Sequence, residues 1–311
     1  MRKVRRDLNI DWIHNKGIRG KNIGVAVLDS GISDHPDFEN RIKAFKDFVG
    51  RERKMYDDEG HGTHVTGIIA GSGNISKGIM TGIAPKADII SIKVLNKKGI
   101  GKEENVINGI KWIIDNGRRY GIRVVNISFG TLKKNESDNN KLTEMVELLW
   151  DLGYVVVAAA GNSGPGPSSI STPGDSKKII TVGADNDNVR MMVNGKMVYN
   201  YSGRGPTKQC IQKPDIVAPA NGIYSCCNLW RKNYFYVQKS GTSMSTPIVS
   251  GIICLMLSVN PKLTNVQCKK IIKKTANDLN MDKNRQGWGK VSAQKAIEKA
   301  NASLLWNTFL I

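Results

Sequence analysis

Several short, almost continuous apolar runs divide the chain, and each ends in small or polar residues. They cover residues 21–28, 88–95, 124–130 and 154–160. Apolar runs of this length without strict alternation are typical of parallel strands that are buried on both faces. We therefore expect these segments to form the centre of a buried sheet.

Helix-like segments separate the runs, among them residues 103–116 and 142–152. Another, residues 244–257, is apolar on nearly all sides, so we expect it to pass through the core. Strands that alternate with helices predict an α/β fold: a doubly wound, mostly parallel sheet with helices on both faces.

Composition agrees with one folded unit, because 40% of the 311 residues are hydrophobic and 32 are glycine. We find no internal repeat, low-complexity linker or composition break that would mark a second domain. The sequence therefore predicts one domain over residues 1–311, with residues 1–20 as an N-terminal extension.

The net charge of +19 comes from 46 basic and 27 acidic residues. Three explanations stay open: nucleic-acid binding, the amino-acid bias of an AT-rich genome, and attraction of acidic peptide substrates. The basic residues are spread along the chain and no nucleic-acid-binding motif is present. We therefore expect no nucleic-acid partner.

Candidate chemistry begins where the first apolar run ends, at Asp29, followed by Ser30 and Gly31. Catalytic residues gather at the carboxyl ends of parallel strands, which makes Asp29 a candidate. Taken alone, an Asp-Ser-Gly segment is more often an ordinary turn.

A second segment holds two histidines, His61 and His64, before a stretch of small and apolar residues. We expect a helix to start at His61, which would hold its imidazole ready to act as a general base. The segment lacks the intervening Glu or clustered Cys residues of zinc sites. We therefore interpret His64 as a structural histidine.

A third segment places Ser243 at the start of the predicted core helix. Free N–H groups and the positive end of the helix dipole would favour an oxyanion beside this serine. Pro247 would be tolerated in the first turn. An ordinary helix cap is the alternative reading of Ser243, and Thr242 and Ser245 are interpreted as caps or packing residues.

The order Asp29, His61, Ser243 along the chain is one of those in which serine triads occur. With residues 158–162 (Ala-Ala-Ala-Gly-Asn), these segments resemble the subtilisin family (subtilases, peptidase family S8) from Lys21 to Val291. The resemblance implies a serine endopeptidase in which Ser243 is the nucleophile, His61 the base and Asp29 its partner. It also implies that the Asn162 side chain and the Ser243 N–H group bind the oxyanion. Without the resemblance, Asn162 would be an ordinary turn residue.

The same resemblance implies a substrate-binding frame. Ser128, Phe129 and Gly130 would form one wall of the primary pocket, and Ala160 and Gly161 the other. Gly99, Ile100 and Gly101 would form an edge segment that pairs with an extended peptide. As isolated strings, these glycines would be read as turns.

No cofactor is required for this chemistry, but Asp37 matches a carboxylate that binds calcium in many relatives. The loop of residues 71–81 contains Lys77 and no carboxylate, whereas calcium takes six to eight oxygen ligands. The calcium site stays open. Two further departures from the family pattern are Ser245 and Ala220, where the family usually has Ala and Gly.

We expect neither a signal peptide nor a pro-domain, and no uninterrupted apolar run reaches membrane-spanning length. The five cysteines form no zinc pattern and suit a reducing compartment. We therefore expect a cytoplasmic protein, resembling intracellular bacterial subtilases, that acts on peptide or protein substrates, acidic ones among them, without a membrane partner.

Two alternatives remain. A dedicated leader-peptide maturation protease would share all of the chemistry and differ in its pockets. An inactive subtilase-fold binding or regulatory protein would be a different class, and it would have no chemical need for Asp29, His61, Asn162 and Ser243 together.

Overall fold

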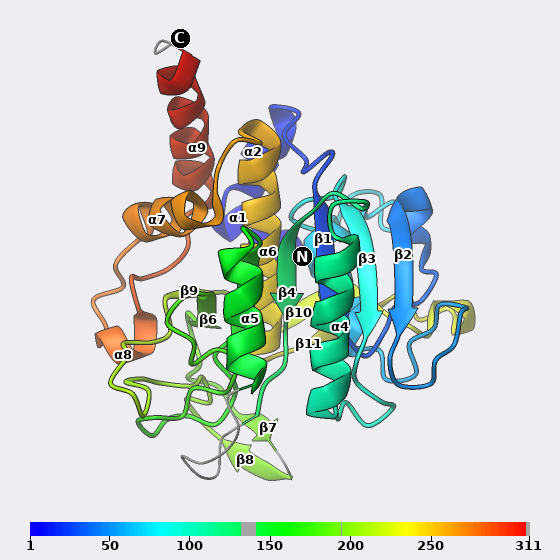
Figure 1. Ribbon diagram of the computed structural model, residues 1–311, viewed down its shortest axis with the longest axis horizontal. Helices are drawn as coiled ribbons and strands as arrows, with labels where there is room; N and C mark the ends of the chain where they lie inside the picture. Colours follow the sequence, from blue (N-terminus) through cyan, green and yellow to red (C-terminus); the bar gives the residue numbers. More distant parts are fainter. Residues whose placement is uncertain (132–140, 194, 309–311) are drawn as a thin grey trace.

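A computed structural model of the chain describes residues 1–131, 141–193 and 195–308 (Figure 1). Its central feature is a seven-stranded sheet in the order β2-β3-β1-β4-β5-β6-β9, in which every neighbouring pair is parallel. The strands are β1 (Gly24–Asp29), β2 (Ile42–Asp47), β3 (Asp88–Lys93), β4 (Ile122–Ile127), β5 (Val155–Ala159), β6 (Ile180–Ala184) and β9 (Ile216–Ala218). Each of the four predicted apolar runs overlaps one strand of this sheet.

Helices cover both faces of the sheet (Figure 1), which confirms the predicted fold class. On one face α4 (Glu103–Asn116) packs against α5 (Lys141–Asp151), and on the other α3 (His61–Ala70) packs against α6 (Thr242–Val259). The remaining helices are α1 (Arg2–Asp7), α2 (Ile10–Asn15), α7 (Asn265–Thr275), α8 (Lys283–Gln286) and α9 (Ala293–Thr308), with 3-10 helices at Pro36–Arg41 and Trp230–Lys232. Two antiparallel pairs complete the fold: β7 (Met191–Val193) with β8 (Lys196–Val198), and β10 (Ile223–Cys226) with β11 (Tyr236–Lys239).

Helix α6 is the core helix that the sequence predicts. Its 18 residues are long and apolar enough to cross a membrane by length and composition, but 83% of them are buried inside the protein. The prediction that Pro247 lies in the first turn is wrong, because the helix begins at Thr242. Pro247 is its sixth residue, and the missing N–H deprives the Ser243 carbonyl of its donor within the helix.

The order of the strands explains where a site can form. From β1 the chain crosses to the edge strand β2, comes back through β3, and continues with β4 on the other side of β1, so the strand order reverses at β1. Crevices at the carboxyl ends of strands beside such a reversal are the usual ligand sites of open parallel sheets. Asp29 is the last residue of β1 and pairs in register with Lys93 at the end of β3.

The first twenty residues pack into the protein. Met1, Val4, Ile10 and Ile13 are buried in the main hydrophobic core, and Arg5 donates to two backbone carbonyls of the loop before β3. The segment that the sequence marked as an extension therefore contributes to the core. That residues 1–311 form a single domain stays a prediction.

Candidate active site

The Asp29 and His61 side chains meet at the carboxyl end of β1. Oδ1 of Asp29 lies 2.8 Å from Nδ1 of His61, the first residue of α3. The Asp29 side chain is 1% exposed and that of His61 20% exposed. The Ser30 N–H group also donates to Oδ1 of Asp29. With Nδ1 directed at the carboxylate, the ring keeps Nε2 for a second partner.

The pKa of His61 lies above the ordinary histidine value of 6.5. Burial lowers it, but the Asp29 carboxylate raises it further through its charge and its hydrogen bond. Lys239 lowers the pKa of His61, and Glu59 raises it. The Asp29 carboxylate therefore stabilises the imidazolium form, as a base that must accept a proton requires.

His64 differs from His61 in both contacts and protonation. Its Nε2 lies 3.0 Å from the Ile223 carbonyl oxygen and 3.1 Å from that of Val237. Burial and the nearby charges of His61 and Lys239 lower the pKa of His64 to about 3. These contacts, which tie α3 to β10 and β11, suit the structural role that the sequence suggests for His64.

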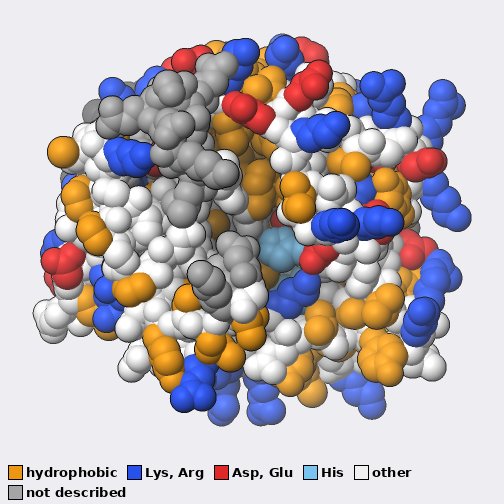
Figure 2. Space-filling model, turned by 90° about the horizontal axis from the view of Figure 1, so that it is seen from below, with side chains coloured by type: hydrophobic (Ala, Val, Ile, Leu, Met, Phe, Trp, Pro, Cys, Tyr) orange, Lys and Arg blue, Asp and Glu red, His pale blue; other side chains and the backbone are white. Residues whose placement is uncertain are grey.

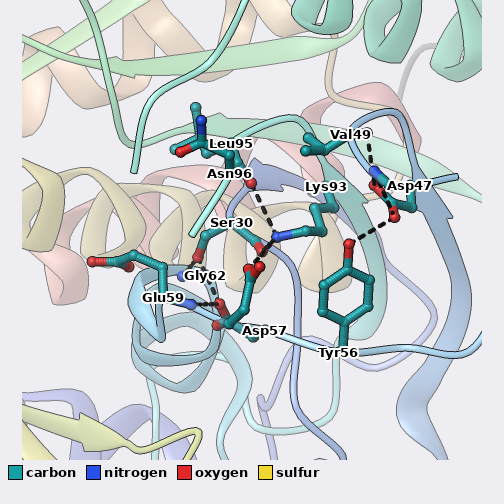
Figure 3. A network of polar contacts seen from close by, with 12 residues as sticks. Ser30, Asp47, Val49, Tyr56, Asp57, Glu59, Gly62, Lys93, Leu95 and Asn96 are labelled. Atoms are coloured by element: carbon teal, nitrogen blue, oxygen red, sulfur yellow. Dashed lines mark hydrogen bonds and ion pairs between the residues drawn. The ribbon is translucent and has the colours of Figure 1, made fainter. Parts of the chain in front are cut away.

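A hydrogen-bond network joins the end of β1 to the start of α3 (Figure 3). Asp57 Oδ1 accepts from the Ser30 hydroxyl (2.8 Å) and from the Gly60 N–H (2.7 Å). Its Oδ2 accepts from the N–H and the hydroxyl of Thr63, and the Gly62 N–H donates to the Ser30 hydroxyl oxygen. Asp57 thus caps the helix that carries His61 and fixes it to the strand that carries Asp29.

Sequence reasoning missed this role of Asp57. Asp57 lies three residues before the N-cap Gly60, so the usual preference for Asp at the N-cap position does not point to it. Its bond to Ser30, 27 residues away, could come only from the fold.

Ser243 is half-buried in the first turn of α6. Asn162 lies against the same turn, where its Oδ1 accepts from the N–H and from the hydroxyl of Thr242, each at 3.0 Å. The Gly161 N–H donates to the Thr242 hydroxyl oxygen. Helix α3, which begins at His61, packs against α6, which begins at Thr242. Within the described residues, no hydrogen bond joins Ser243 to His61.

The two predicted walls of the primary pocket meet at a shared segment. A Cβ atom added at Gly130 would lie 2.7 Å from Ser171 Cβ and 2.8 Å from the Thr172 carbonyl oxygen. At Gly161 it would lie 2.0 Å from the Ser171 hydroxyl oxygen. The Ser171 N–H also donates to the Ala160 carbonyl. Residues 171–172 are therefore the common support of both walls, and sequence reasoning did not name them.

The other two residues of the first wall lie at the end of β4. Ser128 is buried and accepts a hydrogen bond from the Asn126 side chain, while Phe129 is half-buried against the core. The wall is thus held by the sheet.

The predicted edge segment follows β3 and stands open. Its turn is closed by a hydrogen bond from the Asn96 N–H to the Ile100 carbonyl, and Leu95 bridges to Gly101. Ile100 is 62% exposed. Gly99 has a φ of +71°, with no other atom within 4 Å of an added Cβ. A second backbone can approach this segment without displacing a side chain.

Figure 2 shows the face at the carboxyl ends of the strands, where a histidine side chain lies in a hollow beside hydrophobic side chains. Three of the four histidines, His14, His35 and His64, are buried, whereas His61 is partly exposed. Part of the His61 ring is therefore accessible from solvent, whereas the other three histidine rings are not.

Asp37 belongs to a buried group with His35 and Cys226 whose possible ligand atoms lie within 4.8 Å of one another. Asp37 Oδ1 accepts from the Ile75 N–H, and Oδ2 accepts from the Tyr236 hydroxyl at 2.6 Å. Both carboxylate oxygens thus have donors of the protein. The other two members of the group offer nitrogen and sulfur, which does not fit the oxygen-rich shell of calcium.

Comparison with known proteins gives consistent matches. The model of the subtilase family of peptidases matches residues 20–289. Serine protease AprX of Bacillus subtilis (strain 168) is 40% identical over 300 residues, covering 90% of this chain and 67% of that protein. Subtilisin Savinase of Lederbergia lenta is 37% identical over 283 residues, covering 91% and 93%. The chain spans 66% of another relative, the M-protease of Shouchella clausii (strain KSM-K16).

Solved structures agree. The S41 psychrophilic protease superposes with a TM-score of 0.73 at 30% identity, over 88% of this chain and 92% of that one. The prenylagaramide maturation protease PagA superposes with a TM-score of 0.74 at 26% identity, over 94% and 98%.

Proposed function

The chain belongs to the subtilase family and is a subtilisin-like serine peptidase, and on this premise we propose that Asp29, His61 and Ser243 are its catalytic triad. The observation that carries the proposal is the 2.8 Å contact between Asp29 Oδ1 and His61 Nδ1. It lies at the carboxyl end of the central strand, beside the helix that begins next to Ser243.

The arrangement supports acyl transfer. Ser243 Oγ attacks the scissile carbonyl carbon while His61 Nε2 takes the hydroxyl proton. Asp29 keeps the imidazole in the correct tautomer and stabilises its charged form. His61 then gives the proton to the leaving amine, and a water molecule repeats the sequence to release the acyl group.

The negative oxygen of the tetrahedral intermediate needs preorganised donors. We assign the Asn162 side-chain NH₂ and the Ser243 backbone N–H to this task. The start of α6 adds the positive end of a helix dipole. Thr242 holds the amide oxygen of Asn162, so the amide nitrogen is left to face the reaction.

For the substrate, we propose an extended peptide that pairs with Gly99, Ile100 and Gly101. None of the residues assigned to the two pocket walls carries a carboxylate. A Lys or Arg before the scissile bond would be buried without a counter-ion, so apolar or aromatic residues are favoured there. The net charge of +19 adds a preference for acidic residues further out, which weakens as salt rises.

A dedicated maturation protease is the second candidate, since the prenylagaramide maturation protease PagA superposes on 94% of this chain. Both candidates share the catalytic residues. They differ in breadth: a general endopeptidase cleaves many members of a peptide library, and a maturation protease cleaves few.

We propose the cytoplasm as its location and peptides or proteins as its partners, with no nucleic acid or membrane partner. All five cysteines are free thiols, and Cys226, Cys227, Cys254 and Cys268 are buried. Free thiols of this kind are stable in a reducing compartment. Fractionation of the source cells tests this location.

The decisive experiment uses the full 311-residue chain, labelled with a fluorophosphonate that reacts with active serines and then profiled on a peptide library at two salt concentrations. We expect labelling, and cleavage after apolar or aromatic residues. A chain that folds but neither labels nor cleaves is an inactive binding protein. A dominant preference for Lys or Arg before the cut would show that the pocket assignment is wrong.

A further inference from the structure

Lys93 is a fully buried lysine beside the candidate triad. It is the last residue of β3 and pairs in register with Asp29. Its side chain has no exposed surface. A lysine is almost never completely buried unless its charge is paired and its donors are satisfied. The groups around Lys93 must therefore pair its charge and accept hydrogen bonds from its ammonium group.

The ammonium group of Lys93 bonds to three separate segments (Figure 3). It donates to the Ser30 carbonyl at the end of β1 and to the Leu95 carbonyl at the start of the edge segment, the latter at 3.0 Å. Its third partner is Asp58 Oδ1 at 2.6 Å, in the loop before α3. An ammonium group has three N–H donors, so each donor serves one segment.

Tyr56 closes the remaining side of the ammonium. The Lys93 nitrogen lies 4.7 Å from the centre of the Tyr56 ring, a distance at which the ring face attracts a cation. The Tyr56 hydroxyl donates to Asp47 at 2.9 Å (Figure 3). The ring is thus fixed in place, and the lysine lies in a cage of defined geometry.

Two of the anchored segments carry the triad residues. Ser30 follows Asp29 directly, and Asp58 lies three positions before His61. Asp57 joins Ser30 to the start of α3, and Lys93 joins Ser30 to Asp58 in the loop before that helix. The relative position of Asp29 and His61 thus depends on hydrogen bonds of the Asp57 carboxylate and of the Lys93 ammonium group.

From this geometry, and resting on the proposed function, we propose that Lys93 is a positioning residue for the reaction. It touches no reacting atom. It holds the Asp29 strand, the His61 loop and the substrate-binding edge segment in one arrangement. A misplacement of about 1 Å in such a site costs on the order of 10²-fold in rate.

The pH profile separates this role from a merely structural one. The charged and titratable groups around His61 are Asp29 from β1, Glu59 from the preceding loop, His64 on its own helix and Lys239 from β11. Loosening the contact with Asp29 lowers the pKa of His61. Removing a nearby positive charge alone would raise it. The direction of the shift therefore tells the two effects apart.

The experiment replaces Lys93 by methionine, which is similar in length and carries neither charge nor donor. We expect kcat on a short peptide to fall by about 10²-fold, with a smaller rise in KM because the Leu95 carbonyl of the edge segment also loses its donor. The acid midpoint of kcat/KM should move down toward the free histidine value of about 6.5. Lys43→Met is the matched control, because Lys43 forms a 3.6 Å ion pair with Asp88 on the same sheet but is 46% exposed; it should leave both values unchanged.

Asp58→Ala is the second variant, since its side chain is 38% exposed and the chain tolerates change there better than at Lys93. We expect a lower kcat, and in the double variant with Lys93→Met a loss no larger than that of Lys93→Met alone. The role of Lys93 would be overturned if either single variant kept the wild-type kcat. It would also be overturned if the pH midpoint of Lys93→Met rose or did not move, or if the losses in kcat of the two single variants added in the double variant. If the wild-type protein itself had no peptidase activity, the proposed function would be refuted, and the role of Lys93 with it.

Discussion

Asn162 and Thr242 are joined by two hydrogen bonds to a single oxygen. The amide Oδ1 of Asn162 accepts from the Thr242 N–H and from its hydroxyl, each at 3.0 Å. A backbone N–H can only donate, so the amide must present its oxygen to Thr242 and its NH₂ group elsewhere. A Cβ atom added at Gly241 would lie 3.2 Å from that nitrogen. The glycine thus leaves the amide room beside the turn that carries Ser243.

Replacement of Asn162 by alanine should lower kcat far more than it changes KM, because the lost donor acts on charge that develops only in the transition state. The loss of one such donor costs about 10²–10³-fold, a magnitude known from subtilisin itself. Steady-state kinetics on a peptide substrate measure the split. Ser163→Ala, at the exposed next position, is the control, and a loss confined to KM would contradict the assignment.

Ser243→Ala should abolish fluorophosphonate labelling and reduce peptidase activity by several orders of magnitude, since the nucleophile is gone. The fold should persist, because a single oxygen is removed from a half-buried position. Ser258→Ala near the other end of α6 serves as the control, as that hydroxyl only bonds back to the Leu255 carbonyl. Activity of Ser243→Ala within tenfold of the unchanged enzyme would exclude Ser243 as the nucleophile.

The pH dependence should follow His61. Its pKa is lowered by burial and raised further by Asp29, to a value above 6.5. Because the base acts in its neutral form, kcat/KM should fall as the pH drops through a midpoint above 6.5. Rates measured from pH 5 to 9, with circular dichroism to show that the protein stays folded, give this midpoint. A flat profile would contradict His61 as the base.

Opposite charges flank the base and should move that midpoint in opposite directions. Glu59 and Lys239 form a pair with an O–N distance of 3.8 Å, and both act on the pKa of His61. Lys239→Gln should raise the midpoint, because it removes a positive charge that destabilises the imidazolium. Glu59→Gln should lower the midpoint, because it removes a negative charge that stabilises the imidazolium. The opposite signs serve as the internal control. Shifts of the same sign in both variants would show that structure, and not charge, is responsible.

Calcium should not bind through Asp37, since its neighbours His35 and Cys226 offer nitrogen and sulfur ligands in place of oxygens. A calcium ion at that carboxylate, supplied at about 100 times its Kd, would stabilise the fold by about 2.7 kcal/mol. We expect the difference between Tm in excess calcium and Tm in chelator to be the same in the unchanged chain and in Asp37→Asn. A calcium-dependent rise in Tm that Asp37→Asn removes would restore the site.

The sequence by itself determined the elements and the candidate residues. Uninterrupted apolar runs require burial on both faces, and a strand buried in this way belongs to a parallel sheet covered by helices. The predicted helix at 103–116 matches α4 residue for residue, because its pattern and boundaries are local. Asp29, His61 and Ser243 could be proposed from three short segments for the same reason.

Only the tertiary structure decided how these segments meet. The order of the strands brings Asp29 to His61 and places Lys93 beside them, and a strand order leaves no trace in local periodicity. The roles of Asp57 and Lys93 rest on hydrogen bonds between segments 27 and 63 residues apart. Pro247 is the sixth residue of α6, which starts at Thr242, where the Asn162 side chain accepts from the Thr242 N–H across 80 residues of the chain. Burial fixes the elements locally, whereas the polar contacts that orient catalytic side chains join distant residues and exist only once the sheet has formed.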